Sequence, residues 1–277
     1  MMRKSDPGLS YVVGFIMLLM IIAMIIGTWA LVGVPEQTKD AESYHAVTVT
    51  NAFLDYKIAV DNLRLNNQSG MNVSMLIPAA SAYSSGALIF EHAGTLKIEN
   101  TDSTISDAWD VNRISSTFGT TNTIIGYEGG GVYRNDYGYA TWVTPPLFEL
   151  TNISDDLYVT LVVPKLTGNF AVGSTEGIPL ETSFQSPSPV WDTYVTNQTV
   201  TISYTADDEW DAQLWYTAFF EAVAKYEYDE SAGKITNVTC YPSVSGKIAS
   251  LTIHPTYGEI IHFYVLSSEY HVAVGRS

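Results

Sequence analysis

The sequence predicts an α+β protein, in which a long N-terminal hydrophobic and amphipathic helix precedes a β-rich globular head with one buried helix. Two observations carry this prediction. An uncharged apolar run near the N-terminus continues into a helical periodicity that reaches about residue 66. Beyond it, short alternating segments are separated by Gly, Asn and Pro turns. The chain has 277 residues, of which 46% are hydrophobic, so it is long enough to bury a substantial core.

The apolar run indicates where the head lies. No charged residue occurs from Leu9 to Pro35, and about 20 apolar residues suffice for a helix to cross a hydrocarbon layer of about 30 Å. Arg3 and Lys4 precede the run, whereas Glu36 follows it. By the positive-inside rule we expect a single-pass topology, with the N-terminus inside and the domain after the run outside the cell. A cleaved secretory signal is the rival interpretation, but its apolar region is shorter, roughly 7–15 residues.

Helical periodicity persists after the apolar run. Val49, Phe53 and Val60 recur at helical spacing and predict an amphipathic extension over residues 35–66. Residues 46–50 alternate β-branched side chains and locally favour a strand, but the longer periodicity outweighs this signal. Pro35 lacks an amide hydrogen, so we expect it to kink or break the helix at the junction.

The remainder of the chain predicts strands, one long loop and one helix. Gly168–Asn197 is rich in Gly, Pro, Ser and Thr and predicts a loop or linker. A helix is predicted from Thr205 to about Tyr228, with so little polar face that it should be largely buried. The predicted strands are Ser74–Pro78, Gly86–Phe90, Thr95–Glu99, Asn122–Glu128, Val132–Asn135, Tyr139–Thr144, Leu157–Pro164, Thr199–Tyr204, Lys234–Pro242, Lys247–His254, Glu259–Leu266 and His271–Val274.

Charge and cysteine content exclude several classes of protein. The 13 Lys and Arg against 29 Asp and Glu give a formal net charge of -16, so we expect no nucleic-acid partner. Cys240 is the single cysteine, which rules out an intramolecular disulfide and a CxxC metal pair. Its alternating surroundings predict a buried thiol on a strand.

No pattern in the sequence points to catalysis. There is no GxSxG elbow, phosphate-binding loop, HExxH pair or calcium loop. Gly129–Gly131 predicts a turn, and Asp207, Asp208, Glu209 and Asp211 are typical of a helix N-terminus, where the helix dipole favours negative charge. We therefore expect a protein that is not an enzyme and has no catalytic residue and no cofactor.

A metal site is not expected from the five histidines. In a tight hairpin with its tip at Gly258, His254 would pair across from Ile261, which places His262 on the opposite face of the sheet. Two histidines on opposite faces cannot share one metal ion.

Two features would suit an exported surface protein. The 18 Tyr and 6 Trp could stack on sugars, although strand aromatics are also ordinary core material. Asn-x-Ser/Thr sequons are candidate N-glycosylation sites. They begin at Asn67, Asn72, Asn152, Asn197 and Asn237.

The N-terminus carries a more specific pattern. A short basic leader ends at Gly8 and is followed by Leu9-Ser-Tyr-Val-Val-Gly14 and the long apolar helix. This order resembles archaeal type IV pilin-like precursors, which have a class III signal peptide. The resemblance implies that a prepilin-type peptidase cuts after Gly8, so that Leu9 becomes the first residue and the apolar helix is retained. It also implies a β-rich extracellular head.

The resemblance leads to a division of the chain and to an expected function. Residues 1–8 are a leader, residues 9–34 a transmembrane or filament-core helix, residues 35–66 its extension and residues 67–277 the head. We expect a structural subunit of a surface filament, or a pilin-like component of its assembly, which contacts copies of itself or other pilins through its helix after first residing in the membrane. Gly14, Ala23 and Gly27 are small enough to let neighbouring helices approach closely.

Two other functions remain open at this point. The chain could be a single-pass anchored binding or adhesion domain that does not polymerise, in which case its N-terminus would stay intact. It could also be an anchored surface hydrolase, which would need turnover by the head that depends on one carboxylate.

Overall fold

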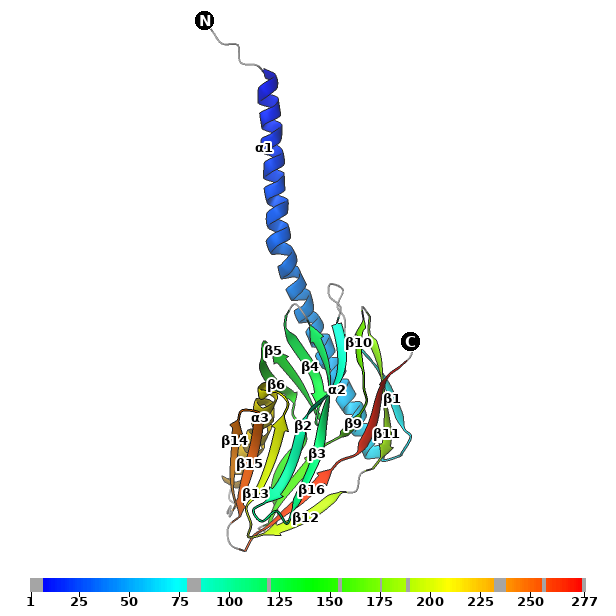
Figure 1. Ribbon diagram of the computed structural model, residues 1–277, viewed down its shortest axis with the longest axis vertical. Helices are drawn as coiled ribbons and strands as arrows, with labels where there is room; N and C mark the ends of the chain where they lie inside the picture. The colour runs from blue at the N-terminus through cyan, green and yellow to red at the C-terminus, as the bar shows by residue number, and fades with distance from the viewer. Residues whose placement is uncertain are drawn as a thin grey trace.

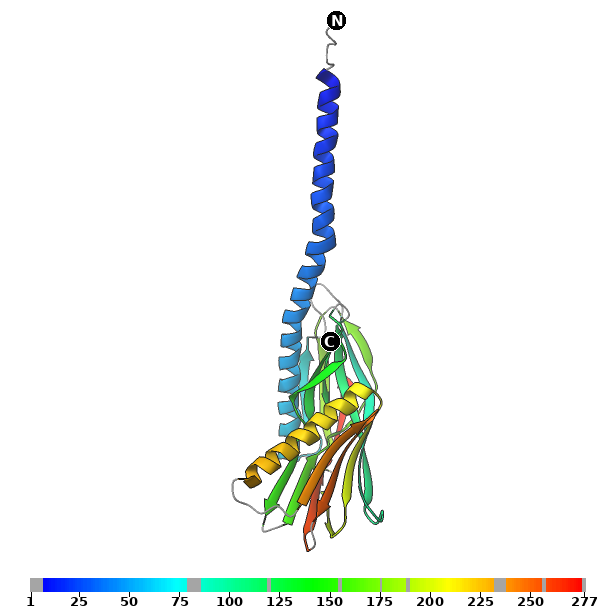
Figure 2. The same ribbon diagram turned by 90° about the vertical axis from the view of Figure 1, so that its left-hand side faces the viewer.

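The structure is a computed structural model that describes residues 7–78, 86–118, 121–153, 156–174, 176–187, 190–231, 238–255 and 258–275. An apolar N-terminal helix projects from a β-rich head, and a further helix lies across that head (Figures 1 and 2). The fold is therefore α+β, as the sequence predicts.

The N-terminal helix is continuous but bends. Helix α1 (Pro7–Thr28) leads through a π-helix (Trp29–Gly33) into α2 (Val34–Asn66), and the direction changes between α1 and α2 in Figure 1. A π-helix wraps one more residue into each hydrogen-bonded ring and is a common origin of kinks. The irregularity thus comes just before Pro35, which sits in the first turn of α2 and does not break the helix.

The described residues of the head form three β-sheets. One has the order β1-β11-β17-β9, the second the order β14-β15-β13-β2-β3-β4-β5-β6 with β10 added beside β2, and the third the order β12-β16-β8-β7. The strands are β1 Asn72–Ile77, β2 Gly86–Asn100, β3 Ser106–Phe118, β4 Thr123–Glu128, β5 Gly131–Asp136, β6 Tyr139–Thr144, β7 Phe148–Ile153, β8 Asp156–Val162, β9 Lys165–Thr167, β10 Ala171–Ser174, β11 Ile178–Ser186, β12 Trp191–Thr196, β13 Val200–Ala206, β14 Val238–Ser245, β15 Ile248–Pro255, β16 Ile260–Leu266 and β17 Glu269–Val274.

The long strands β2 and β3 correct the sequence analysis. The two strands predicted at Gly86–Phe90 and Thr95–Glu99 are one strand with a bulge between His92 and Gly94. At Gly94 a Cβ atom would lie 2.4 Å from the carbonyl oxygen of Thr205, so only glycine allows this close approach. Strand β3, which pairs with β2 along most of its length, was not predicted at all.

The predicted loop at Gly168–Asn197 is also wrong, because it contains β10, β11 and β12. Strand β11 lies between β1 and β17, and β12 pairs with β16. These polar strands are stabilised by backbone hydrogen bonds to strands that are distant in the sequence, rather than by the strand propensity of their own residues.

The two faces of β3–β5 carry two separate cores. Ile125 and Tyr127 face α2, where Tyr127 meets Tyr56 edge to face with ring centroids 5.2 Å apart. Tyr133 lies on the opposite face and packs against Trp210 of α3 (Glu209–Ser231), with centroids 5.5 Å apart. Successive strand residues point to opposite faces, so this part of the sheet is buried between two helices.

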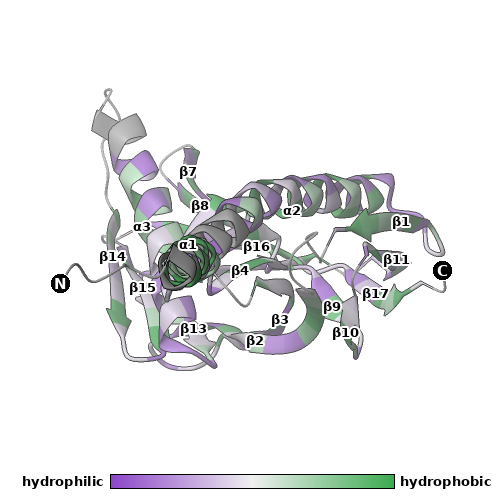
Figure 3. Cartoon of the chain, turned by 90° about the horizontal axis from the view of Figure 1, so that it is seen from above, coloured by the Kyte–Doolittle hydropathy of each residue, from purple (hydrophilic) through white to green (hydrophobic). Residues whose placement is uncertain are grey.

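The periodicity predicted for α2 is confirmed. The hydrophobic residues that are 4% exposed or less recur at spacings of three and four, and their face packs on β1, β4, β5 and β11. These residues are Ala46, Val49, Phe53, Tyr56, Val60 and Leu63. Viewed from above, α2 shows alternating hydrophobic and hydrophilic residues along its length, in contrast to α1 (Figure 3).

Helix α3 is buried on one face only. Leu214, Trp215 and Phe219 are in the core, but Phe220 is 52% exposed, which corrects the expectation of a largely buried helix. The expected hairpin between His254 and Ile261 is wrong as well. Strand β15 is already flanked by β13 and β14, so β16 pairs instead with β12 and, in parallel, with β8.

Candidate functional site

The exposed apolar helix is the feature of the molecule that most needs an explanation. Residues Val12–Leu31 have a mean hydropathy of 2.6, and none of this segment is buried against the head. By length and composition the segment could cross a membrane. Apolar side chains surround it on all sides, with Met24 69% and Leu31 79% exposed. A soluble amphipathic helix would have a polar face, and this helix has none.

The few polar groups of this helix suit an environment without water. The hydroxyl of Thr28 donates a 2.8 Å hydrogen bond to the carbonyl oxygen of Met24, so it is satisfied within the helix itself. Trp29 follows at the end nearer the head and is 58% exposed. Tryptophan is enriched at this position of transmembrane helices, because its indole spans the boundary between hydrocarbon and water.

Of the predicted packing residues, the structure places two together. Ala23 and Gly27 are one turn apart on the same face, whereas Gly14 lies about 180° around the helix from Ala23 at 100° per residue. A Cβ atom added at Gly14 or Gly27 would meet nothing within 4 Å. Nothing inside this chain therefore requires glycine at either position.

The predicted cleavage position lies at the start of α1. Gly8 and Leu9 belong to the first turn of α1, and the surroundings of both residues lie outside the described part of the structure. Processing after Gly8 stays a prediction.

Helix α2 fixes the apolar helix to the head. The Tyr56 hydroxyl and Thr182 Oγ1 share a 2.8 Å hydrogen bond, and burial raises the pKa of that tyrosine above its usual value. The backbone amide of Thr121 donates to the carboxylate of Glu42, which is buried, at 2.9 Å. Because α1 continues into α2, the head and the apolar helix are joined by a helix rather than by a flexible linker.

The predicted glycosylation sites differ in their surroundings. Asn67 at the end of α2 and Asn72 at the start of β1 are exposed, whereas Asn152 in β7 is half-buried. Asn197 is exposed but accepts a 2.6 Å hydrogen bond from the amide of Gly258 through Oδ1. Asn237 lies outside the described residues.

A buried ionic cluster joins α3 to the sheet, and the sequence did not reveal it. Glu128 and Asp211 have no exposed surface, and the guanidinium of Arg113 lies beside both. Arg113 Nη1 is 3.3 Å from Asp211 Oδ2 and 3.8 Å from Glu128 Oε2. The hydroxyl of Tyr204 donates to both carboxylates, at 3.0 Å and 3.1 Å, and the Trp215 indole donates to Glu128 at 2.7 Å.

Burial controls the protonation of this cluster. Desolvation raises the pKa of Glu128, although the positive charge of Arg113 acts in the opposite direction. Desolvation also raises the pKa of Asp211, and the neighbouring negative charge of Glu128 raises it further. Within the part of the chain that the structure describes, Glu128 Oε2 and Asp211 Oδ1 have no hydrogen-bond donor. The two carboxyl groups interact with each other, and the raised pKa of Asp211 favours its protonated form. The expectation that Asp211 only complements a helix dipole is therefore incomplete.

The other residues considered for chemistry are dispersed. His92 pairs with Asp207 at 3.0 Å, His254 with Thr199 at 2.8 Å and His262 with Asp156 at 3.5 Å. Across the described ranges, no group of three His, Cys, Asp or Glu side chains could hold a metal ion. Cys240 is buried in β14, as predicted.

Sequence comparison decides the family. Residues 8–254 match the DUF7289 family, which is described as a family of unknown function. The chain belongs to the DUF7289 family. The match covers both the apolar helix and most of the head, so these two parts occur together in the DUF7289 family. No curated protein and no solved structure matches this chain.

Proposed function

We propose that this DUF7289 protein is a pilin-like structural subunit of an archaeal type IV pilus-like surface filament, or a component of its assembly, and that it contacts other subunits through α1. The observation that carries the proposal is the uncharged segment Val12–Leu31, of which none is buried by its own head. Each apolar side chain removed from water stabilises the buried state by on the order of 1.5–3 kcal/mol. Lipid and a bundle of identical helices both provide this burial.

The connection between helix and head supports assembly. A subunit that packs through its helix must transmit that packing to its head, and the helical junction from α1 to α2 provides a direct connection. Small residues on two sides of α1, namely Gly14 on one side and Ala23 and Gly27 on the other, would allow neighbours on both sides. Before assembly the same helix would hold the protein in the membrane with its head outside the cell.

Processing is part of the proposal. A prepilin-type peptidase would cleave after Gly8, and the mature chain would begin at Leu9. Mass spectrometry of the native N-terminus tests this step directly. A mature chain that retains Met1 or Met2 would contradict it, and Gly8→Trp is expected to leave the leader attached.

Disulfide crosslinking of α1 tests assembly. In a Cys240→Ser background, a single Ala23→Cys change can give only dimers, because each chain forms one bridge. The double change Gly14→Cys and Ala23→Cys places thiols on opposite sides of the helix, so a filament or bundle should give a ladder of dimers, trimers and larger species. Tyr139→Cys, at an 82% exposed position of the head, is the control for bridges that form when chains collide at random.

The alternative function is a single-pass anchored domain that binds or adheres without polymerising. An aromatic cavity on the head, described below, favours this possibility. It predicts monomers for both cysteine variants and no filaments in electron micrographs of sheared surface material.

A further inference from the structure

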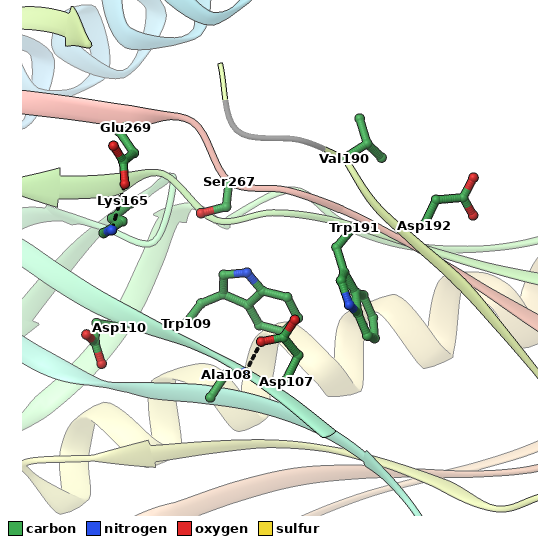
Figure 4. Close-up of a pocket in the computed structure, with 10 residues that line it drawn as sticks. All are labelled: Asp107, Ala108, Trp109, Asp110, Lys165, Val190, Trp191, Asp192, Ser267 and Glu269. Carbon is green, nitrogen blue, oxygen red and sulfur yellow. Dashed lines mark hydrogen bonds and ion pairs between the residues drawn. The ribbon is translucent and has the colours of Figure 1, made fainter. Parts of the chain in front are cut away.

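A cavity on the head collects two tryptophans and several carboxylates (Figure 4). It encloses about 470 Å³ between the first half of β3 and the beginnings of β12 and β17, a volume typical of small-molecule sites. Its lining consists of Asp107, Ala108, Trp109, Asp110, Lys165, Val190, Trp191, Asp192, Ser267 and Glu269. The residues come from segments that are far apart in the sequence, so only the fold brings them together.

The two tryptophans are held in place by other rings. Trp109 and Trp191 meet edge to face, with ring centroids 5.4 Å apart and an angle of 74° between their planes. Trp191 also packs against the buried Phe263, with ring centroids 6.2 Å apart. Both tryptophans remain partly exposed, so each presents part of its ring to the cavity. Rigid aromatic surfaces bind a ligand at a low cost in side-chain entropy.

Two other tryptophans of the head use their indole N–H groups within the protein, whereas in the part that the structure describes Trp109 and Trp191 do not. Trp142 donates to the carbonyl oxygen of Leu214 at 2.8 Å, and Trp215 donates to Glu128 at 2.7 Å. Within the described residues, the indole nitrogens of Trp109 and Trp191 have no such partner. In Figure 4 the indole nitrogen of Trp191 is on the side of its ring that faces Trp109. The cavity therefore offers hydrogen-bond donors that the protein does not use.

The cavity also offers unused acceptors. Lys165 pairs with Glu269 at 2.6 Å, and Asp107 accepts a 2.9 Å hydrogen bond from the amide of Ala108. In the described part of the chain, Asp110 and Asp192 are exposed and make no hydrogen bond or ion pair. Four carboxylates against one ammonium make the lining negative, so anionic ligands are repelled.

We propose that this cavity binds a neutral hexose unit of a glycan. The ligand must accept hydrogen bonds from indole N–H groups, donate hydrogen bonds to carboxylates and present an apolar face to an indole ring. A hexose ring does all three through its hydroxyl groups and its C–H face. An ammonium ion cannot accept from the indoles, and a uronic acid meets four carboxylates. This proposal does not depend on whether the chain assembles into filaments.

Titration of the full-length chain with methyl hexosides tests the proposal. The protein is held in a zwitterionic detergent without a sugar headgroup, and methyl glucoside, methyl galactoside and methyl mannoside are added while tryptophan fluorescence and saturation-transfer NMR are recorded. At least one hexoside should saturate with a Kd on the order of 1 mM. Glucuronic acid should bind at least about tenfold more weakly, because the lining repels its charge.

Two variants separate the donors from the acceptors. Trp109→Phe keeps an aromatic ring but removes the N–H donor, and Asp192→Asn removes a charged acceptor from an exposed position. Each should weaken binding roughly tenfold, the effect of losing one hydrogen bond to a ligand hydroxyl. Asp55→Asn, which changes an exposed carboxylate on α2, is the matched control and should bind as the parent does. An unchanged near-ultraviolet circular dichroism spectrum establishes that each variant is folded.

The result that would overturn the proposal is equally direct. Failure of every hexoside to saturate, or equal binding by the two cavity variants and the control, would exclude a hexose site. The hexose could be attached to a neighbouring copy of this chain or to a foreign polysaccharide. Comparing protein that carries its glycans with an Asn67→Gln, Asn72→Gln variant distinguishes these sources, since only an attached glycan would compete with the added hexoside.

Discussion

Replacing Arg113 with Met should destabilise the head strongly, and more strongly at pH 7 than at pH 5. The side chain of Arg113 is only 6% exposed and lies 3.3 Å from Asp211 and 3.8 Å from Glu128, both without exposed surface. Removing one partner of such a buried cluster leaves uncompensated negative charge, which costs about 3–5 kcal/mol. The loss includes the contact of the guanidinium with the ring of Trp210, whose centroid is 4.9 Å away.

The pH dependence follows from the direction of the pKa shifts. Burial raises the pKa of both carboxyl groups above their unfolded values, and Arg113 opposes this shift at each of them. Without Arg113 the folded-state pKa values rise further, so the folded protein binds more protons than the unfolded chain above about pH 4. Stability then falls as pH rises, by about 1.4 kcal/mol per pH unit for each retained proton, until pH exceeds the folded pKa.

Urea unfolding of the full chain in detergent micelles, followed by tryptophan fluorescence from pH 4 to 8, measures this effect. The matched rescue combines Arg113→Met with Glu128→Gln and Asp211→Asn, which preserves acceptors for the Trp215 and Tyr204 hydrogen bonds but removes the buried charge. The triple variant should regain most of the lost stability at pH 7. A loss below about 1 kcal/mol, one that does not change with pH, or no rescue would refute the assignment of the cluster as a charge-balanced unit.

Three further predictions concern Asp211 of the same cluster and the two segments of the N-terminal helix. The raised pKa of Asp211 makes the parent protein less stable as pH increases above about 4. Asp211→Asn should remove this decline, and unfolding curves of the parent and the variant at several pH values measure the difference. Phe53→Ala should cost about 3–5 kcal/mol in urea unfolding, whereas Tyr44→Ala on the same helix, at an 81% exposed position, should change stability by less than about 0.5 kcal/mol. Leu19→Arg should reduce the membrane-associated fraction after cell fractionation, because a central arginine costs about 2.5–3.5 kcal/mol on insertion; Leu65→Arg on α2, 71% exposed, should leave that fraction unchanged.

The elements that the sequence predicts correctly are those specified by local pattern. The apolar face of α2 follows from its own spacing of three and four residues. The turn between β5 and β6, where Gly138 has a φ of 90°, falls in the gap between the predicted strands Val132–Asn135 and Tyr139–Thr144. Helix α3 begins close to its acidic residues, as the dipole argument requires. In each case one short segment contains the whole signal.

What the sequence did not predict depends on distant partners. Strand β3 (Ser106–Phe118) is rich in Ser, Asp and Asn, and its inward-facing residues change from one face to the other as it passes from the α3 core to the α2 core. Neither a simple alternation nor an apolar run marks it. Arg113 and Asp211 are 98 positions apart in the sequence, and they meet only because α3 packs against the sheet that contains β3. The aromatic cavity similarly requires β3 and β12 to lie near each other.

The long N-terminal helix thus combines two segments that differ in how their apolar side chains are distributed and buried. From Ala46 onwards the apolar side chains on one face are buried by the head, whereas from Val12 to Leu31 apolar side chains cover every face and the head buries none of them. The π-helix at Trp29–Gly33 lies between these regions. The bend at this π-helix separates the apolar segment from the head, so none of its apolar surface is buried within the described chain. If the full-length protein were soluble and monomeric without detergent, with α1 folded against its own head, neither membrane insertion nor packing between copies would be needed.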